Sequence, residues 1–196
     1  MNVLNRDQFL SSDAGIIGGI PFPDLFGAML NADMVLDMAS LFDLYEGQGL
    51  DAAFAGALEV DRSGSINVTR KGNRLFGLGG FNHLTQSAPK IVICTRFQVG
   101  SDLKNENGHW IPTDGTADKF VEQAETITMN APYFHSLGKT VLYITERAVF
   151  RLGEKGLVLT ELLPGVTVES IQTRLPFPIE TASDLNPIPV ECYSFS

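Results

Sequence analysis

The sequence predicts an α/β fold built in layers, and three observations support this class. Continuous apolar stretches rich in β-branched residues, such as KIVICTRF at 90–97, are typical of buried strands. The segments at 77–89, which begins with glycines, and at 166–175, which has Thr167 near its start, are typical of short helices. Hydrophobic residues form 44% of the 196 residues, enough for a sizeable core. We expect a single domain over 1–196.

The expected elements follow in chain order. Residues 24–46 are apolar with acids every few positions, which predicts a helix or a short strand followed by a helix. Residues 50–69 hold two apolar stretches around DRSG, an Asp-x-x-Gly turn that predicts a hairpin. The stretch TITM at 126–129 is a further candidate strand, and residues 140–165 predict two or three strands around the turn GEKG.

The C-terminal part combines a helix signal with a proline-rich segment. Thr167 stands at the start of VESIQTRL, where it can cap a short helix. Four prolines follow from residue 176 onward. Because proline cannot donate a backbone hydrogen bond, we expect residues 176–196 to form a tail that runs over the surface.

Charge is unevenly distributed along the chain. The formal net charge of −9 argues against nucleic acid or an anionic membrane as a partner. Residues 1–61 hold ten acids and one base, whereas residues 62–101 hold six bases and no acid. Such a basic segment in an acidic protein is what a phosphate-bearing ligand requires. The alternative is a solvated strand face.

Several classes of protein are not indicated. No apolar run reaches the roughly 18 residues that a membrane-spanning helix needs. The two cysteines, Cys94 and Cys192, lie far apart and match no metal spacing, nor do the histidines, so we expect no metal and no permanently bound cofactor. Cys94 is expected inside a buried strand. This cysteine usage, with no secretory signal at the N-terminus, predicts a cytoplasmic protein.

Two glycine-rich motifs carry candidate chemistry. In SSDAGIIGGIPF at 11–22, Asp13 precedes three closely spaced glycines, and its carboxylate can serve as a nucleophile, a base or a turn cap. In GLGG at 77–80 the pattern falls short of a dinucleotide fingerprint, because position 82 is Asn. This second motif is either a tight turn or a set of backbone N–H groups offered to an anion.

Several stretches occur together in the order and spacing seen in family I CoA-transferases. They are DAGIIGGIP, YEGQGLDAAFAGALEVDRSGSINVTR, GLGGFNHLTQSAPKIVICTRF, KFVEQAETITM and GKTVLYITERAVFRLGEKGLVLTELLPGV. Over residues 8–175 the chain resembles the β-type half of the propionate and acetate CoA-transferases. The resemblance implies an open sheet of the CoA-transferase type with flanking helices. It also implies coenzyme A as a substrate, together with short-chain acyl-CoA and short carboxylic acids.

The resemblance implies a nucleophile at Asp13. In that family a glutamate in an E-x-G-x-x-G-G stretch attacks the acyl-CoA thioester, forms an anhydride and then a glutamyl-CoA thioester, and passes CoA to an acceptor carboxylate. Asp13 matches this glutamate, and Gly15, Gly18 and Gly19 match the glycines. A carboxylate suits this chemistry, because the CoA thiolate can reopen the anhydride that it forms.

The resemblance also implies groups that bind the substrate. Backbone amides of the family's GxGG loop hold the thioester oxygen, and an asparagine lines the active site. The matching positions here are Gly77, Gly79, Gly80 and Asn67. Because the basic segment carries this loop, we expect it to face the CoA phosphates through Arg70, Lys71 and Arg74.

The chain departs from the family pattern in two respects. Aspartate is one methylene shorter than glutamate, so the Asp13 carboxylate retreats by roughly 1.5 Å on a fixed backbone. A misplacement of about 1 Å can cost roughly 10²-fold in rate. In addition, nothing before Asp13 matches the strand and glycine-rich turn that open the β-type half, and the α-type half has no counterpart. We therefore expect an α-type partner chain or a homo-oligomer.

Three functions remain open at this point. The first is CoA transfer as the β-type half of a transferase. The second is a CoA-binding or scaffold protein that derives from a transferase and no longer turns substrate over. The third is thioester hydrolysis, in which water takes the acyl group from the Asp13 adduct. Fold alone does not choose among them.

Overall fold

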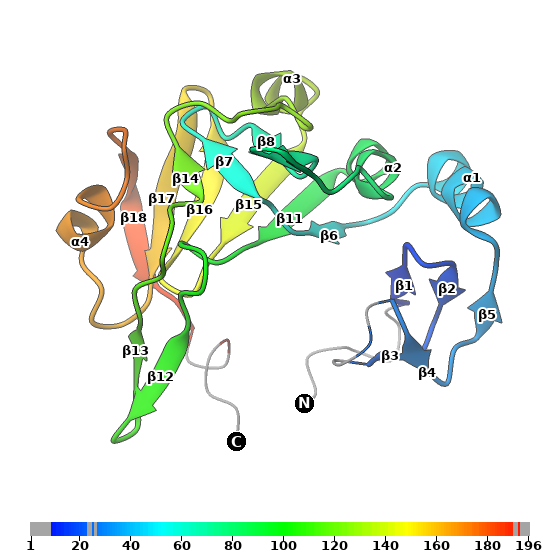
Figure 1. Cartoon of the computed structure of the whole chain (residues 1–196), viewed down its shortest axis with the longest axis horizontal. Coiled ribbons are helices and arrows are strands. Elements are labelled where there is room, and N and C mark those ends of the chain that lie inside the picture. The colour runs from blue at the N-terminus through cyan, green and yellow to red at the C-terminus, as the bar shows by residue number, and fades with distance from the viewer. Residues whose placement is uncertain (1–8, 23–24, 26, 190–191, 193–196) are drawn as a thin grey trace. The chain divides into compact units, whose positions relative to one another are not determined.

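The computed structural model describes residues 9–22, 25, 27–189 and 192 (Figure 1). The sequence predicts one domain, whereas the chain in this structure forms two compact units. The first unit contains residues 1–50 and 79–87, and the second contains residues 51–78 and 88–196. The GLGG motif is therefore divided, with Gly77 in the second unit and Gly79 and Gly80 in the first.

The first unit consists of short strands and two helices. Strand β2 pairs antiparallel with both β1 and β5, and β3 pairs with β4. Helix α1 begins after Asp37, whose carboxylate accepts a hydrogen bond from the Ser40 amide at 3.0 Å, and it packs against α2. The described elements are β1 Ser11–Ser12, β2 Ile16–Ile17, β3 Ile20–Pro21, β4 Met29–Leu30, β5 Met34–Val35, α1 Met38–Gln48 and α2 Phe81–Ser87. Of the two predictions for residues 24–46, the structure supports the strand followed by a helix.

The second unit is built on a six-stranded sheet in the order β18-β17-β16-β15-β11-β6 (Figure 1). Strands β6, β11 and β15 run parallel, β16 and β17 continue as antiparallel neighbours, and β18 runs parallel to β17. The bounds are β6 Ala53–Ala55, β11 Lys90–Cys94, β15 Thr140–Ile144, β16 Ala148–Gly153, β17 Gly156–Leu162 and β18 Glu180–Pro187. This mixed sheet with flanking helices confirms the predicted α/β class.

Smaller elements complete the second unit. Strands β7 and β8 form the hairpin predicted around DRSG, where the Asp61 carboxylate accepts hydrogen bonds from the Ser63 and Ser65 amides. Thr167 caps α4 as predicted. The bounds are β7 Glu59–Asp61, β8 Ile66–Asn67, β9 Arg70–Lys71, β10 Arg74–Leu75, β12 Leu103–Glu106, β13 His109–Pro112, β14 Phe120–Val121, α3 Ala131–Ser136 and α4 Val168–Gln172.

The core of the second unit lies between this sheet and the segments that cover it. Phe97, Phe120 and Phe150 are buried and their rings pack together. The ring centroid of Phe120 lies 4.9 Å from that of Phe97 and 5.4 Å from that of Phe150. Tyr143 of β15 is fully buried and donates its hydroxyl hydrogen to the Gly64 carbonyl oxygen at 2.6 Å. This bond joins the central sheet to the β7–β8 turn.

Three sequence-based expectations need correction. Residues 180–187 of the expected surface tail form β18 at the edge of the large sheet, where a proline costs no ladder bond. Cys94 is exposed, because alternation along β11 turns Ile91 and Ile93 to the core instead. The TITM stretch forms no named strand and contributes a single bridge between Met129 and Ile66.

Candidate functional site

Asp13 lies at the tip of the β1–β2 hairpin in the first unit. The Gly15 amide closes the turn by donating to the Ser12 carbonyl oxygen at 3.0 Å, and the Ala14 amide donates to the Ser12 hydroxyl oxygen at 3.3 Å. Asp13 is half-buried, and its carboxylate makes no hydrogen bond or ion pair with another described residue. The side chain that caps this turn is therefore Ser12, and the Asp13 oxygens stay available.

The glycines that follow Asp13 shape this loop. The Gly18 amide donates to the Leu10 carbonyl oxygen at 2.7 Å, so the Gly15 and Gly18 amides are both used within the loop. Gly18 has a φ of 78°, and a Cβ at this position would collide with the Asp33 carboxylate. A Cβ on Gly19 would meet the Leu30 carbonyl oxygen. These glycines permit a tight backbone around Asp13.

The fold of the first unit brings Asp13 to the second glycine motif. A Cβ built on Gly80 would lie 3.0 Å from the Asp13 Cβ, although the two residues are 67 positions apart. In the part of the chain that the structure describes, the amides of Gly79 and Gly80 donate to no acceptor. The Gly77 amide, in the second unit, donates to the Thr69 carbonyl oxygen at 3.3 Å. Gly80 therefore lies beside Asp13, and the N–H groups of Gly79 and Gly80 are not used by another described residue.

Asn67, in the second unit, is fully buried, and both polar atoms of its side chain form hydrogen bonds. Its amide nitrogen donates to Glu59 Oε2 and to the Arg70 carbonyl oxygen, both at 2.7 Å. Its amide oxygen accepts from the Thr69 and Arg70 backbone N–H groups at 3.0 and 3.2 Å. In this structure Asn67 shapes the 67–70 turn and holds Glu59.

The three basic residues predicted for phosphate binding differ in their surroundings. Lys71 forms an ion pair with the buried Glu59, and Arg70 lies 3.6 Å from Glu125. Arg74 has no carboxylate partner among the described residues, and its guanidinium carbon lies 4.6 Å from the Phe76 ring centroid. Of the three, Arg74 is the cation whose charge is uncompensated.

Glu59 is a buried acid for which sequence analysis proposed no role. Burial raises its pKa, but hydrogen bonds from Lys71, Asn67 and the Glu125 amide outweigh burial and leave the pKa below its usual value of 4.5. The predicted hairpin brings the segment of Glu59 beside that of Asn67, but only the structure shows that these two residues are paired. Tyr45 was likewise not assigned a role, although its side chain is buried on α1.

Because its folded-state pKa is lowered, Glu59 stabilises the second unit above about pH 4.5, and this contribution is lost as pH falls below that value. We expect Glu59→Gln to lower the free energy of unfolding at pH 7 by about 1–3 kcal/mol, with a smaller difference at pH 3.5. Melting curves from pH 3.5 to 7 measure this. Glu154→Gln, at an exposed turn, is the matched control, and equal melting of Glu59→Gln and wild type at every pH would contradict the assignment.

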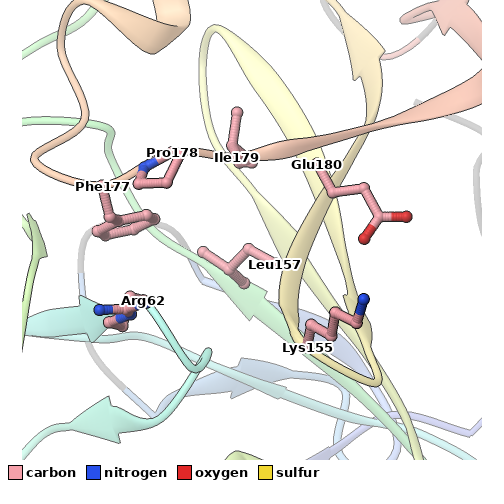
Figure 2. Close-up of a pocket in the computed structure, with 7 residues that line it drawn as sticks. All are labelled: Arg62, Lys155, Leu157, Phe177, Pro178, Ile179 and Glu180. Carbon is pink, nitrogen blue, oxygen red and sulfur yellow. The ribbon is translucent and has the colours of Figure 1, made fainter.

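A surface hollow of about 270 Å³ lies elsewhere in the second unit (Figure 2). Leu157, Phe177 and Ile179 line it, with Arg62, Lys155, Pro178 and Glu180. Arg62 pairs with Glu122 at 2.7 Å, and Figure 2 shows the Lys155 and Glu180 side chains on the same side of the hollow. None of the predicted site residues contributes to it. Among the described residues, no cluster of His, Cys, Asp and Glu side chains is arranged to hold a metal ion.

Comparison with known proteins relates the chain to CoA-transferases. No family model matches the chain. The chain is 34% identical to caffeate CoA-transferase from Acetobacterium woodii over an alignment of 185 residues, and the match covers 90% of this chain and 35% of that protein. It is 27% identical to acetate CoA-transferase subunit beta from Escherichia coli K12, covering 90% of this chain and 78% of the subunit. The structure of the acyl-CoA transferase YdiF from E. coli O157:H7 matches with a TM-score of 0.83 at 33% identity, covering 92% of this chain and 35% of YdiF.

This chain is a homologue of the CoA-transferases and corresponds to their β-type part. The recognition made from its motifs is confirmed. The chain spans about a third of the length of caffeate CoA-transferase and YdiF. Decarboxylase AibA/AibB, at 20% identity and a TM-score of 0.69, shares the fold alone. No helix in the described residues is long and apolar enough to cross a membrane.

Proposed function

We propose that this CoA-transferase homologue transfers CoA between a short-chain acyl-CoA and a carboxylic acid, with Asp13 as the nucleophile. The observation that carries the proposal is the placement of Asp13. Its carboxylate lies on a tight turn without a described partner, and its Cβ lies beside Gly80. The CoA-transferases named above support transfer over the scaffold and hydrolase alternatives.

The reaction proceeds in four carboxylate–thiolate exchanges. An Asp13 oxygen attacks the thioester carbonyl carbon, the C–S bond breaks, and an acyl-aspartyl anhydride and CoA thiolate form. The thiolate attacks the Asp13 carbonyl carbon and releases the first carboxylate, which leaves an aspartyl-CoA thioester. The acceptor carboxylate then attacks this thioester and again frees the thiolate. The thiolate finally attacks the acceptor's acyl carbon, which forms the new acyl-CoA and restores Asp13.

Each attack places negative charge on a carbonyl oxygen. Backbone N–H groups that face this oxygen stabilise the charge, and loss of one such donor typically costs about 10²–10³ in rate. We assign this role to the Gly79 and Gly80 amides, because they lie in the same unit as Asp13 and donate to no described acceptor. In this proposal Asn67 acts indirectly, by shaping the turn that precedes the basic residues.

Chromatography of the CoA esters tests the reaction class. The purified chain, alone and with an α-type chain, is incubated with acetyl-CoA and propionate. Propionyl-CoA and acetate in equal amounts are the expected products. Release of free CoA and acetate without propionyl-CoA would indicate hydrolysis, and unchanged acetyl-CoA in both preparations would indicate a non-catalytic protein.

We propose that Arg74 contacts the CoA phosphates. Lys71 and Arg70, which pair with Glu59 and Glu125, lie near it in the sequence and add positive charge to the same segment. Arg74→Ala is expected to weaken CoA binding by about threefold to tenfold and to reduce its dependence on salt. Calorimetric titration at two salt concentrations measures both effects. Arg62→Ala removes the same charge from the same basic segment and serves as the control. If the two variants bind CoA equally well, the basic segment is a solvated face and does not bind the phosphates.

A partner chain is the further part of this proposal. The first unit exposes large apolar side chains, with Val35 73% exposed, Leu25 60% and Ile20 59%. We expect an α-type chain or a second copy of this chain to cover them, and we propose the cytoplasm as the compartment. Analytical ultracentrifugation at micromolar concentration, alone and with an α-type chain, is expected to show assemblies larger than the monomer. A monomer under both conditions, with no binding of an apolar dye, would contradict this expectation.

A further inference from the structure

Helix α1 contacts both parts of the proposed site. Phe42 and Tyr45 are three residues apart on this helix and therefore share one face, with ring centroids 6.3 Å apart. Tyr45 is buried and reaches the hairpin that carries Asp13, whereas Phe42 reaches Gly80. The proposal below rests on the proposed function of Asp13.

The Tyr45 hydroxyl is tied to the hairpin by a directed hydrogen bond. The Ser11 hydroxyl donates its hydrogen to the Ile16 carbonyl oxygen at 3.0 Å. Because a serine hydroxyl has only one hydrogen, Tyr45 is the donor in the 2.5 Å contact between the Tyr45 and Ser11 hydroxyl oxygens. Ser11 is in β1 and Ile16 is in β2, so this chain of bonds links α1 to both strands that flank Asp13.

Phe42 fixes the other side of the site. A Cβ built on Gly80 would lie 3.0 Å from two carbons of the Phe42 ring. The same ring stacks on His83 of α2, with centroids 4.3 Å apart and planes at 8°. His83 is held in turn by Glu46 of α1, with Nδ1 and Oε1 2.5 Å apart. Helix α1 thus holds the start of α2, where Gly80 lies, and the Asp13 hairpin at the same time.

The electrostatics agree with this arrangement. Burial raises the pKa of Tyr45 above its usual value, the bond with Ser11 lowers it, and the negative charge of Asp13 raises it further. The Asp13 carboxylate is therefore close enough to Tyr45 for its charge to act on the phenol. This effect offers a measurement of their proximity that does not depend on turnover.

We propose that Tyr45 is a positioning residue for Asp13. Its hydroxyl locks the β1–β2 hairpin to α1, while Phe42 on the same helix holds Gly80. The carboxylate and the glycine amides thereby keep a fixed separation. Tyr45 itself touches neither the acyl group nor CoA in this account.

Tyr45→Phe tests the proposal, because it removes one hydroxyl and keeps the ring. We expect hydrogen exchange at the Gly18 amide, which bonds to Leu10 in the hairpin, to accelerate about threefold to tenfold. We expect kcat for CoA transfer to fall by a similar factor, with KM for acyl-CoA unchanged. Tyr133→Phe, at an exposed tyrosine of the second unit, is the control and should change neither quantity. Unchanged Gly18 exchange in Tyr45→Phe would overturn the proposal, as would an unchanged kcat.

A second measurement separates this proposal from the proposed function. In Asp13→Asn the negative charge is removed, so the pKa of Tyr45 is expected to fall relative to wild type, as followed by NMR. If wild type shows no transfer at all, the proposed function fails, and Gly18 exchange and the Tyr45 titration then decide the positioning role. No change in the Tyr45 titration would overturn the proximity on which that role depends.

Discussion

Replacement of Asp13 by alanine is expected to lower the rate of CoA transfer by more than about 10³-fold, because it removes the atom that forms the covalent intermediate. The free energy of unfolding should change by less than about 1 kcal/mol, since Ser12 caps the turn and no described residue bonds to the Asp13 carboxylate. Steady-state assays and thermal melts measure the two quantities. Full activity in Asp13→Ala, or a protein that no longer folds, would assign Asp13 a structural role.

The conservative variants of Asp13 refine this expectation. Asp13→Asn keeps the size of the side chain and removes its nucleophilic charge, so it should be as inactive as Asp13→Ala. Asp13→Glu adds the methylene present in the family's glutamate and is expected to raise the rate of adduct formation. A rate that falls in Asp13→Glu would show that the loop is built around the shorter side chain.

Replacement of Gly80 by alanine is expected to reduce transfer by about 10²-fold. The new Cβ would lie 3.0 Å from the Asp13 Cβ and from the Phe42 ring, so the hairpin or the start of α2 must move. A Cβ cannot rotate away, because its position is set by the backbone. A displacement of the carboxylate by about 1 Å is enough to account for a loss of this size.

Gly47→Ala is the matched control for Gly80→Ala. Gly47 is in α1 of the same unit, and a Cβ there would have no neighbour within 4 Å. We expect this variant to keep its activity and to gain up to about 1 kcal/mol of stability, because alanine favours a helix more than glycine does. If both glycine variants lose activity equally, or if neither does, the close approach of Gly80 to Asp13 has no part in the reaction.

The sequence predicted those parts of the fold that depend on local signals. Strand β11 follows from its run of β-branched residues, and α4 follows from Thr167, whose hydroxyl oxygen accepts from the Ser170 amide. The edge strand β18 was missed because the prolines in and around it indicate irregular chain, and only its position beside β17 shows that the sheet tolerates Pro187. The strands of the first unit are each two residues long, and a pattern of two residues carries too little signal to predict a strand.

For the candidate site too, the sequence predicts the local motifs and does not predict the tertiary contacts. The motif around Asp13 and its resemblance to the CoA-transferases predict Asp13 as the nucleophile and the glycines that follow it as its neighbours. The approach of Gly80, the bond between Tyr45 and Ser11, and the pairing of Lys71 with Glu59 depend on tertiary contacts. No spacing in the sequence specifies these contacts, although they determine which of the predicted residues remain free to act.

The most direct test of Asp13 as a nucleophile is the mass of the protein after brief incubation with acetyl-CoA, alone and with an α-type chain. We expect a gain equal to one CoA minus one water, located on the peptide that contains Asp13. This gain should disappear when hydroxylamine or an acceptor acid is added, and it should be absent from Asp13→Ala. No CoA adduct in either preparation, or an adduct that persists in Asp13→Ala, would contradict the account.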